Sequence, residues 1–219
     1  MISAMKQHAM KQHAVKKQIL NLVICICLLM PMPSLAIEKP DLVIQQTVQT
    51  LIDEFTSQRD LFESDQRKLF ALVDRIALPL FDFNRISKLV LAKNWKRASE
   101  QQRSEFGEEF RKLLIGTYAT ALFQYTGNET MTFTGSTITE RKGWKFAKVQ
   151  SEVTLAGSAP IPVEYSLILG KDDHWKIYNL SIDGLNMVTN YRETYGSTIS
   201  SKGLDGLIES MKQSNARNF

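Results

Sequence analysis

Apolar residues recur at helical spacing after about residue 40. In the segment that begins at Asp41, their i, i+4, i+7, i+8, i+11 spacing is typical of an amphipathic helix. The residues concerned are Ile44, Val48, Leu51, Ile52 and Phe55. The pattern therefore predicts that the chain begins its folded part with a helix that has one apolar side.

Three more helices are predicted before residue 127, each with its own boundary signal. Ser64 opens the second, which ends before Pro79, because proline cannot continue a helix. Asp82 can cap a short third helix that runs to about residue 92. Ser99 followed by Gln102 is a capping-box pattern, and it opens the longest helix, which ends before Gly127. The first half of the chain is thus predicted to be helical.

The pattern changes after Gly127 to alternation of apolar and polar residues between turn signals, which predicts β-strands. The strands are expected at residues 129–134, 137–141, 144–155, 161–169 and 175–182. Their connections are short, so neighbouring strands should be antiparallel. Helices are predicted again at 186–199 and 204–213, separated by Gly203. This order predicts an α+β fold, in which a curved antiparallel sheet is covered by the N-terminal and C-terminal helices.

The first 36 residues have the order of parts of a signal peptide. Four lysines and no acid precede an apolar stretch at 19–30, which is too short for the roughly 20 residues that cross a bilayer as a helix. Small residues at Ser34-Leu35-Ala36 place the expected cleavage near Ala36 and leave 37–219 as one domain. Cys25 and Cys27 both lie in the apolar stretch, so the predicted mature chain has no disulfide or thiolate metal site.

Charge gives no indication of a nucleic-acid partner. The chain has 27 Lys and Arg against 23 Asp and Glu, but four of these bases lie in the predicted signal peptide. The predicted mature chain is therefore formally neutral, whereas a nucleic-acid-binding domain is usually basic.

No catalytic constellation is evident from the spacing of polar residues. After Ala36 the single histidine is His174, which follows Asp172 and Asp173 in a predicted hairpin turn, and a turn accounts for these polar residues. There is neither a Gly-x-Ser-x-Gly nucleophile motif nor a Gly-rich phosphate loop. Asp82 and Asp183 stand where helix caps are expected. We therefore expect no enzyme activity, no metal and no cofactor.

Two predicted strands have strongly apolar alternate positions. One carries Ile161, Val163, Tyr165, Leu167 and Leu169, and the other carries Ala147, Val149, Ser151, Val153 and Leu155. Helices must cover such faces. Periodicity alone fits a solid core as well as an apolar cavity.

Two blocks of sequence resemble the MlaC family, also called the toluene-tolerance auxiliary component of ABC transporters. The first contains Phe81-Asp82-Phe83-Asn84-Arg85-Ile86-Ser87, Leu89 to Trp95, Gln102, Phe106, Phe110, Leu113-Leu114 and Tyr118. The second contains Trp175-Lys176-Ile177-Tyr178-Asn179-Leu180, Ile182-Asp183-Gly184, Val188-Thr189-Asn190-Tyr191-Arg192 and Tyr195. The resemblance spans about 41–211. Asn94, Asn179 and Asn186 depart from the residues usual in the family, and Asn179 replaces a carboxylate with a neutral acceptor.

The resemblance implies a monomeric periplasmic carrier of diacyl phospholipid. Its expected partners are an outer-membrane lipoprotein complex and an inner-membrane ABC transporter complex, which together maintain outer-membrane lipid asymmetry. The expected fold has an apolar pocket between sheet and helices. The sheet side of this pocket is expected from Val149, Val153, Val163, Tyr165, Leu167, Leu169 and Ile177, and the helix side from Leu114, Tyr118 and Leu122.

Two other functions remain open at the level of sequence. A periplasmic scaffold or protein-binding module would have a packed interior and no lipid. A small-molecule enzyme would need an acid or histidine in the pocket, and a one-residue error in strand register would turn Glu152 and Glu164 inward.

Overall fold

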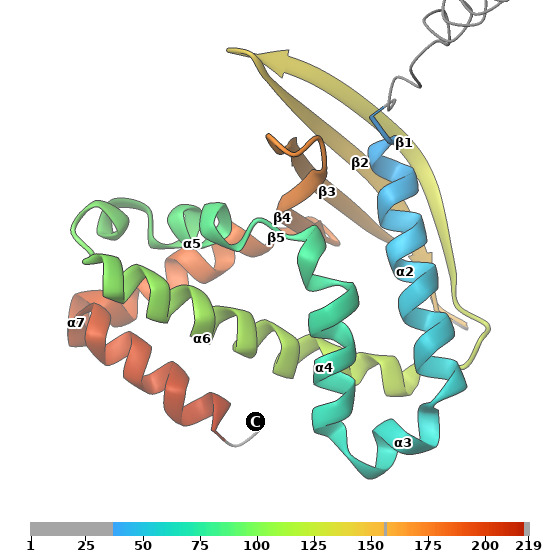
Figure 1. Ribbon diagram of the computed structural model, residues 1–219, viewed down its shortest axis with the longest axis horizontal. Coiled ribbons are helices and arrows are strands. Elements are labelled where there is room, and N and C mark those ends of the chain that lie inside the picture. Colours follow the sequence, from blue (N-terminus) through green and yellow to red (C-terminus); the bar gives the residue numbers. More distant parts are fainter. Residues whose placement is uncertain (1–36, 156, 217–219) are drawn as a thin grey trace, which may run out of the picture. The chain divides into compact units, whose positions relative to one another are not determined.

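The computed structural model describes residues 37–155 and 157–216, and the predicted signal peptide and cleavage site lie outside these residues. The helical elements are α2 (Pro40–Ser57), α3 (Arg59–Ser64), α4 (Gln66–Ile76), η1 (Leu78–Leu80), α5 (Phe83–Leu91), η2 (Ala92–Lys96), α6 (Glu100–Tyr118), η3 (Ala119–Gln124) and α7 (Met187–Asn215). The strands are β1 (Thr130–Arg141), β2 (Trp144–Thr154), β3 (Ile161–Leu169), β4 (Trp175–Ile182) and β5 (Leu185–Asn186). The predicted α+β class is confirmed (Figure 1).

The five strands form one antiparallel sheet in the order β1-β2-β3-β4-β5. The prediction of two separate strands at 129–134 and 137–141 was wrong, because β1 runs through this region without a turn. The β1–β2 register shifts between Phe133 and Gly135, so only one extra residue is inserted. One extra residue makes a bulge, which bends a strand but does not reverse it.

The helix caps expected at Asp82 and Ser99 are present in the structure. The Asp82 side chain accepts a hydrogen bond from the Arg85 backbone N–H, and Ser99 and Gln102 form the reciprocal capping box of α6. The second predicted helix begins later than expected, because Asp65 and not Ser64 caps α4, and α3 occupies the preceding residues. These caps fix where each helix leaves its loop.

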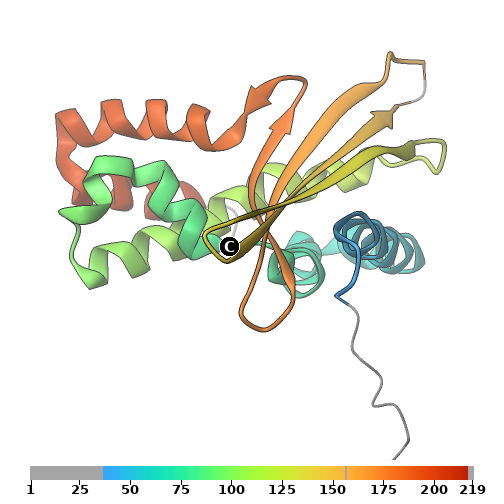
Figure 2. The same cartoon turned by 90° about the horizontal axis from the view of Figure 1, so that it is seen from above.

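The helices form two groups around the sheet (Figure 2). Helix α2 packs on the inner face of the sheet, where Ile44 joins a buried cluster with Val149 and Leu167. Helices α5, α6 and α7 pack together through a second cluster that includes Phe106 and Phe110. A third cluster joins α2, α3, α4 and η3.

The C-terminal helix is interrupted and then anchored. Gly203 has a φ of 73°, which breaks α7 where the sequence predicted a separation between two helices. Near its end, the Asn215 side chain donates hydrogen bonds to the Glu109 carbonyl at 2.9 Å and carboxylate at 2.7 Å. Desolvation opposes the charge of Glu109, but the hydrogen bonds from Asn215 and Lys112 outweigh it and lower the pKa of this carboxyl.

Candidate functional site

The strand register decides which side chains face the helices. Val149 pairs with Tyr165, and Ala147 pairs with Leu167, so the apolar alternate positions of β2 and β3 share the inner face. Glu152 and Glu164 stand at the other alternate positions and therefore lie on the outer face. Glu164 forms an ion pair with Lys148 there, at 2.9 Å. These two acids thus lie on the face of the sheet that points away from the helices.

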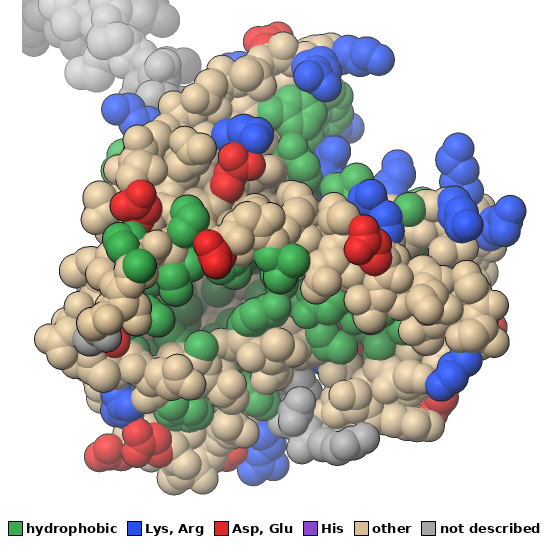
Figure 3. Space-filling model, turned by 180° about the vertical axis from the view of Figure 1, so that it is seen from behind, with side chains coloured by type: hydrophobic (Ala, Val, Ile, Leu, Met, Phe, Trp, Pro, Cys, Tyr) green, Lys and Arg blue, Asp and Glu red, His purple; other side chains and the backbone are tan. Residues whose placement is uncertain are grey.

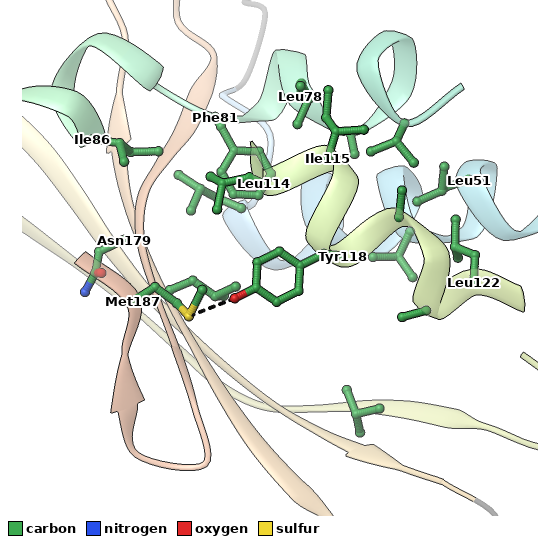
Figure 4. Close-up of a pocket in the computed structure, with 18 of the residues that line it drawn as sticks. Leu51, Leu78, Phe81, Ile86, Leu114, Ile115, Tyr118, Leu122, Asn179 and Met187 are labelled. Atoms are coloured by element: carbon green, nitrogen blue, oxygen red, sulfur yellow. Dashed lines mark hydrogen bonds between the residues drawn. The ribbon is translucent and has the colours of Figure 1, made fainter. Parts of the chain in front are cut away.

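Between the sheet and the helices lies a cavity of about 560 Å³. This volume is within the range of roughly 300–1,000 Å³ that is usual for small-molecule sites. Figure 4 shows apolar side chains from α2, η1, α6 and η3 directed into it, and Figure 3 shows a hollow lined by hydrophobic side chains. The wall from the helices includes Leu51, Leu78, Ile86, Leu114, Ile115 and Leu122. The wall from the sheet includes Met131, Val153, Ile177 and Leu180.

Two polar side chains of the cavity wall, Asn179 and Glu129, are engaged by backbone N–H groups. The Asn179 side-chain oxygen accepts a hydrogen bond from the Val188 backbone N–H at 3.3 Å, and so it helps to hold the start of α7. The Glu129 carboxylate accepts hydrogen bonds from the backbone N–H groups of Thr126 and Gly127. Desolvation opposes its charge, yet these donors prevail and lower the pKa of Glu129. Both polar groups therefore hold the backbone at the edge of the cavity, and most of the wall is apolar.

Phe81 marks the point where the three apolar clusters meet. It is half-buried and packs against all three of them, and it also lines the cavity. Other wall residues come from each cluster in turn, for example Phe110 from the first and Ile115 from the second. The cavity therefore lies at the junction of the clusters and not inside one of them.

An aromatic contact borders the cavity between α6 and α7. The Tyr118 hydroxyl lies 3.7 Å from the Met187 sulfur, and Tyr118 is 45% exposed (Figure 4). Burial raises the pKa of the neighbouring Tyr191 above its usual range, and Tyr118 adds to this rise. The Tyr191 phenol is therefore neutral at physiological pH and does not place charge in the apolar wall.

The structure brings together five of the ten predicted pocket residues. Val153, Ile177, Leu114, Tyr118 and Leu122 all line the cavity. The other five, Val149, Val163, Tyr165, Leu167 and Leu169, are not part of its wall. Val149, Leu167 and Leu169 are buried in the cluster beneath α2, and Tyr165 packs against that cluster. Helix α2 thus divides the inner face into a packed part and a part that borders the cavity.

Much of the cavity wall was missed by sequence reasoning. Phe81, Phe83, Ile86 and Val90 line the cavity and stand in the segment that carries the family resemblance, but they are not among the residues expected to form the pocket. Their apolar spacing could have placed them on one side of a helix. It could not have shown that this side borders empty space.

The predicted hairpin turn at His174 is confirmed as a structural feature. Asp172 accepts a hydrogen bond from the His174 backbone N–H at 3.4 Å, within the turn between β3 and β4. Within the described residues, no group of three or more His, Cys, Asp or Glu side chains could hold a metal ion. A search of the same residues finds no helix that is both long and apolar enough to cross a membrane.

The fold and site define a class of α+β protein in which a helix-covered antiparallel sheet encloses an apolar ligand cavity. The sequence pattern of the family described as MlaC protein matches residues 45–213, and the chain belongs to this family. It is 27% identical over 179 residues to the toluene tolerance protein ttg2D of Pseudomonas putida, with 80% of each sequence covered.

Two further comparisons extend over most of the chain. It is 24% identical over 183 residues to the intermembrane phospholipid transport system binding protein MlaC of Haemophilus influenzae, covering 83% of this chain and 84% of the relative. A solved structure of a phospholipid-binding protein from Ralstonia solanacearum, in complex with a phospholipid, has a TM-score of 0.72 and 25% identity. That match covers 83% of this chain and 99% of the other. The expected family is therefore confirmed.

Proposed function

We propose that the chain binds one diacyl phospholipid in the cavity and carries it through the periplasm without chemical conversion. Its partners would be an outer-membrane lipoprotein complex and an inner-membrane ABC transporter complex, and its role would be to maintain outer-membrane lipid asymmetry. The observation that carries the proposal is the apolar cavity of about 560 Å³. The similar proteins of Haemophilus influenzae and Ralstonia solanacearum, whose names refer to phospholipid, support it.

The need for a protein carrier follows from the hydrophobic effect. Two acyl chains with roughly 30 methylenes would cost on the order of 20 kcal/mol or more to expose to water, at about 0.8 kcal/mol for each methylene. Unassisted crossing of an aqueous compartment is then negligible. A cavity that replaces the bilayer contact removes this cost and requires no covalent step.

Five wall residues are the proposed contacts of the acyl chains, namely Val153, Ile177, Leu114, Tyr118 and Leu122. Of the remaining five residues of the sequence prediction, Val149, Tyr165, Leu167 and Leu169 belong to the cluster beneath α2 or pack against it, and Val163 is also buried. A lipid would reach them only if α2 moved away from the sheet. The proposed carrier acts as a monomer after export and cleavage near Ala36, and energy for directional transport would come from the transporter.

Native mass spectrometry of the protein purified from a periplasmic extract tests this function. We expect a bound mass of one diacyl phospholipid, identified by solvent extraction. Leu114 faces the cavity, so Leu114→Glu should abolish lipid retention. Thr117 is exposed on the same helix and does not line the cavity, so Thr117→Glu should retain the lipid.

Two results would contradict the carrier function. One is a folded wild-type protein that is empty and takes up no phospholipid from vesicles. The other is equal lipid retention by the Leu114 and Thr117 variants, since binding would then not depend on the cavity. In either case a scaffold or protein-binding module would become the better account.

A further inference from the structure

The bases of this protein are distributed unevenly over its surface. Residues 83–99 contain five bases and no acid, although the chain from 37 to 219 is formally neutral. Arg85 of this segment pairs with Asp82. The other four are exposed, and within the described part of the chain they form no ion pair. They are Lys88, Lys93, Lys96 and Arg97.

A second group of bases surrounds exposed apolar side chains at the β1–β2 hairpin. Arg141, Lys142 and Lys145 form no ion pair among the described residues, and Trp144 between them is 41% exposed. Ile138 on the adjoining strand is 54% exposed. The hairpin tip thus combines an indole, an aliphatic side chain and unpaired positive charge.

The register explains why this tip is free of the rest of the fold. Pairing between β2 and β3 begins at Phe146, so the residues from 140 to 145 have no third strand beside them. β1 is the edge strand on the other side. Figure 1 shows the tip standing above the helices, and α5 and η2 lie on the same upper side.

Lys and Arg side chains gather at the top and along the upper right of Figure 3, over the hairpin tip and the α5–η2 region. We call these two regions together the basic face; it comprises residues 88–97 and 138–145, which contain seven bases and one acid, Glu140. An anionic bilayer surface attracts such unpaired bases. Trp prefers the level of the lipid headgroups, where its ring is apolar on one side and hydrated on the other.

We propose that the basic face docks this protein on the anionic surface of a phospholipid bilayer, with Trp144 entering the headgroup layer. An acidic protein surface could attract the bases, but the protruding tip would then place Trp144 and Ile138 outside a packed interface. A bilayer accepts a protruding apolar tip without a preformed pocket. This docking goes beyond the proposed cargo binding, because it involves no residue of the cavity wall named above.

Vesicle flotation with the full exported protein tests the docking. The probes are vesicles of phosphatidylcholine alone and vesicles of phosphatidylcholine mixed with phosphatidylglycerol. We expect binding to the mixed vesicles only, and weaker binding as salt rises, because salt screens exposed charges. Each base at such a surface strengthens binding by about fivefold, so Lys93→Gln with Lys96→Gln should weaken it by roughly twentyfold to thirtyfold.

Matched variants lie at the opposite end of the molecule. Arg67→Gln with Lys68→Gln removes the same charge at the start of α4 and should leave binding unchanged. Trp144→Ser should weaken binding and remove the blue shift of tryptophan fluorescence on mixed vesicles. Leu61→Ser, at an apolar residue of similar exposure on α3, should do neither.

Several results would overturn the docking. One is failure of the wild-type protein to bind mixed vesicles at low salt, and another is equal weakening of binding by the two charge-removing double variants. A third is that the Lys93 and Lys96 double variant binds vesicles as the wild type does but loses binding to a protein partner, since the basic face would then recognise an acidic protein. Native mass spectrometry of the same variants reports the cargo separately, so a failure of docking is distinguishable from a failure of the carrier function.

Discussion

Arg59 should be among the surface residues that contribute most to the free energy of unfolding, because its guanidinium binds backbone carbonyls in one wall of the cavity. Nη1 donates a hydrogen bond to the Tyr125 carbonyl at 2.8 Å, and Nη2 donates another to the Phe123 carbonyl. Both carbonyls lie at the end of η3, which supplies Leu122 to the cavity wall. The guanidinium also lies over the Phe55 ring, 5.4 Å from its centroid.

The size of the effect follows from these contacts. A hydrogen bond from a charged donor contributes about 1.5–3 kcal/mol when it is buried. The Arg59 side chain is 37% exposed, so we take the low end and discount it for solvent. Two such bonds and the ring contact then give about 2 kcal/mol in total. In a domain of this size that corresponds to a fall in Tm of about 4–8 °C.

The assay is equilibrium unfolding by urea together with thermal unfolding, on the wild-type protein and Arg59→Gln. Arg67→Gln is the control, because its ion pair with Asp65 is 72% exposed on the arginine side and should contribute less than about 1 kcal/mol. Glu63→Gln separates the exposed ion pair of Arg59 from its carbonyl contacts and should also have a small effect. Equal losses for Arg59→Gln and Arg67→Gln would refute the reasoning.

Three further predictions concern the cavity wall, a helix cap and acid stability. Val153→Asp should weaken phospholipid retention by about a hundredfold, because a bound acyl chain would desolvate the new carboxylate. Thr134→Asp, at an exposed residue of β1 that does not line the cavity, should not weaken it. Lipid retained after exchange against empty vesicles measures both variants, and equal retention would be inconsistent with the cavity site. Asp82→Ala should destabilise the protein by about 1 kcal/mol in urea unfolding and Asp82→Asn by much less, since Asn also caps helices; equal effects would contradict the capping role. The pKa of Glu109 is lowered in the folded state, so its charge contributes to the free energy of unfolding above the unfolded pKa of about 4.3, and this contribution is lost as pH falls. The stability difference between wild type and Glu109→Gln should therefore shrink in unfolding curves measured at acid pH. A difference that stays constant or grows below that pH would argue against this reasoning.

Local features were predictable from sequence because short-range chemistry decides them. The caps at Asp82 and Ser99 depend on hydrogen bonds within three residues, and the inward alternation of β3 depends only on strand geometry. The continuity of β1 was not predictable in the same way. Gly135 and its neighbours read as a turn, but pairing with β2 carries the strand through as a bulge.

The cavity itself depends on where the helices lie over the sheet, and no periodicity encodes this. Val149 and Val153 have the same chemistry, the same strand and the same face. Ile44 of α2 belongs to the buried cluster around Val149, whereas Val153 borders open space. The sequence showed that both side chains point inward. The position of α2 decides which one packs in the core and which one is available to a ligand.

The meeting of three apolar clusters around Phe81 affects how fast this protein is degraded in a cell. Without cargo the clusters border a void, so each can loosen with less resistance from the others. Cargo that fills the void ties them into one cooperative unit and lowers the population of partly opened forms. Proteases cleave opened forms, so an empty molecule should be degraded faster than a loaded one. Turnover would then match the amount of this protein to the supply of lipid, with no dedicated sensor.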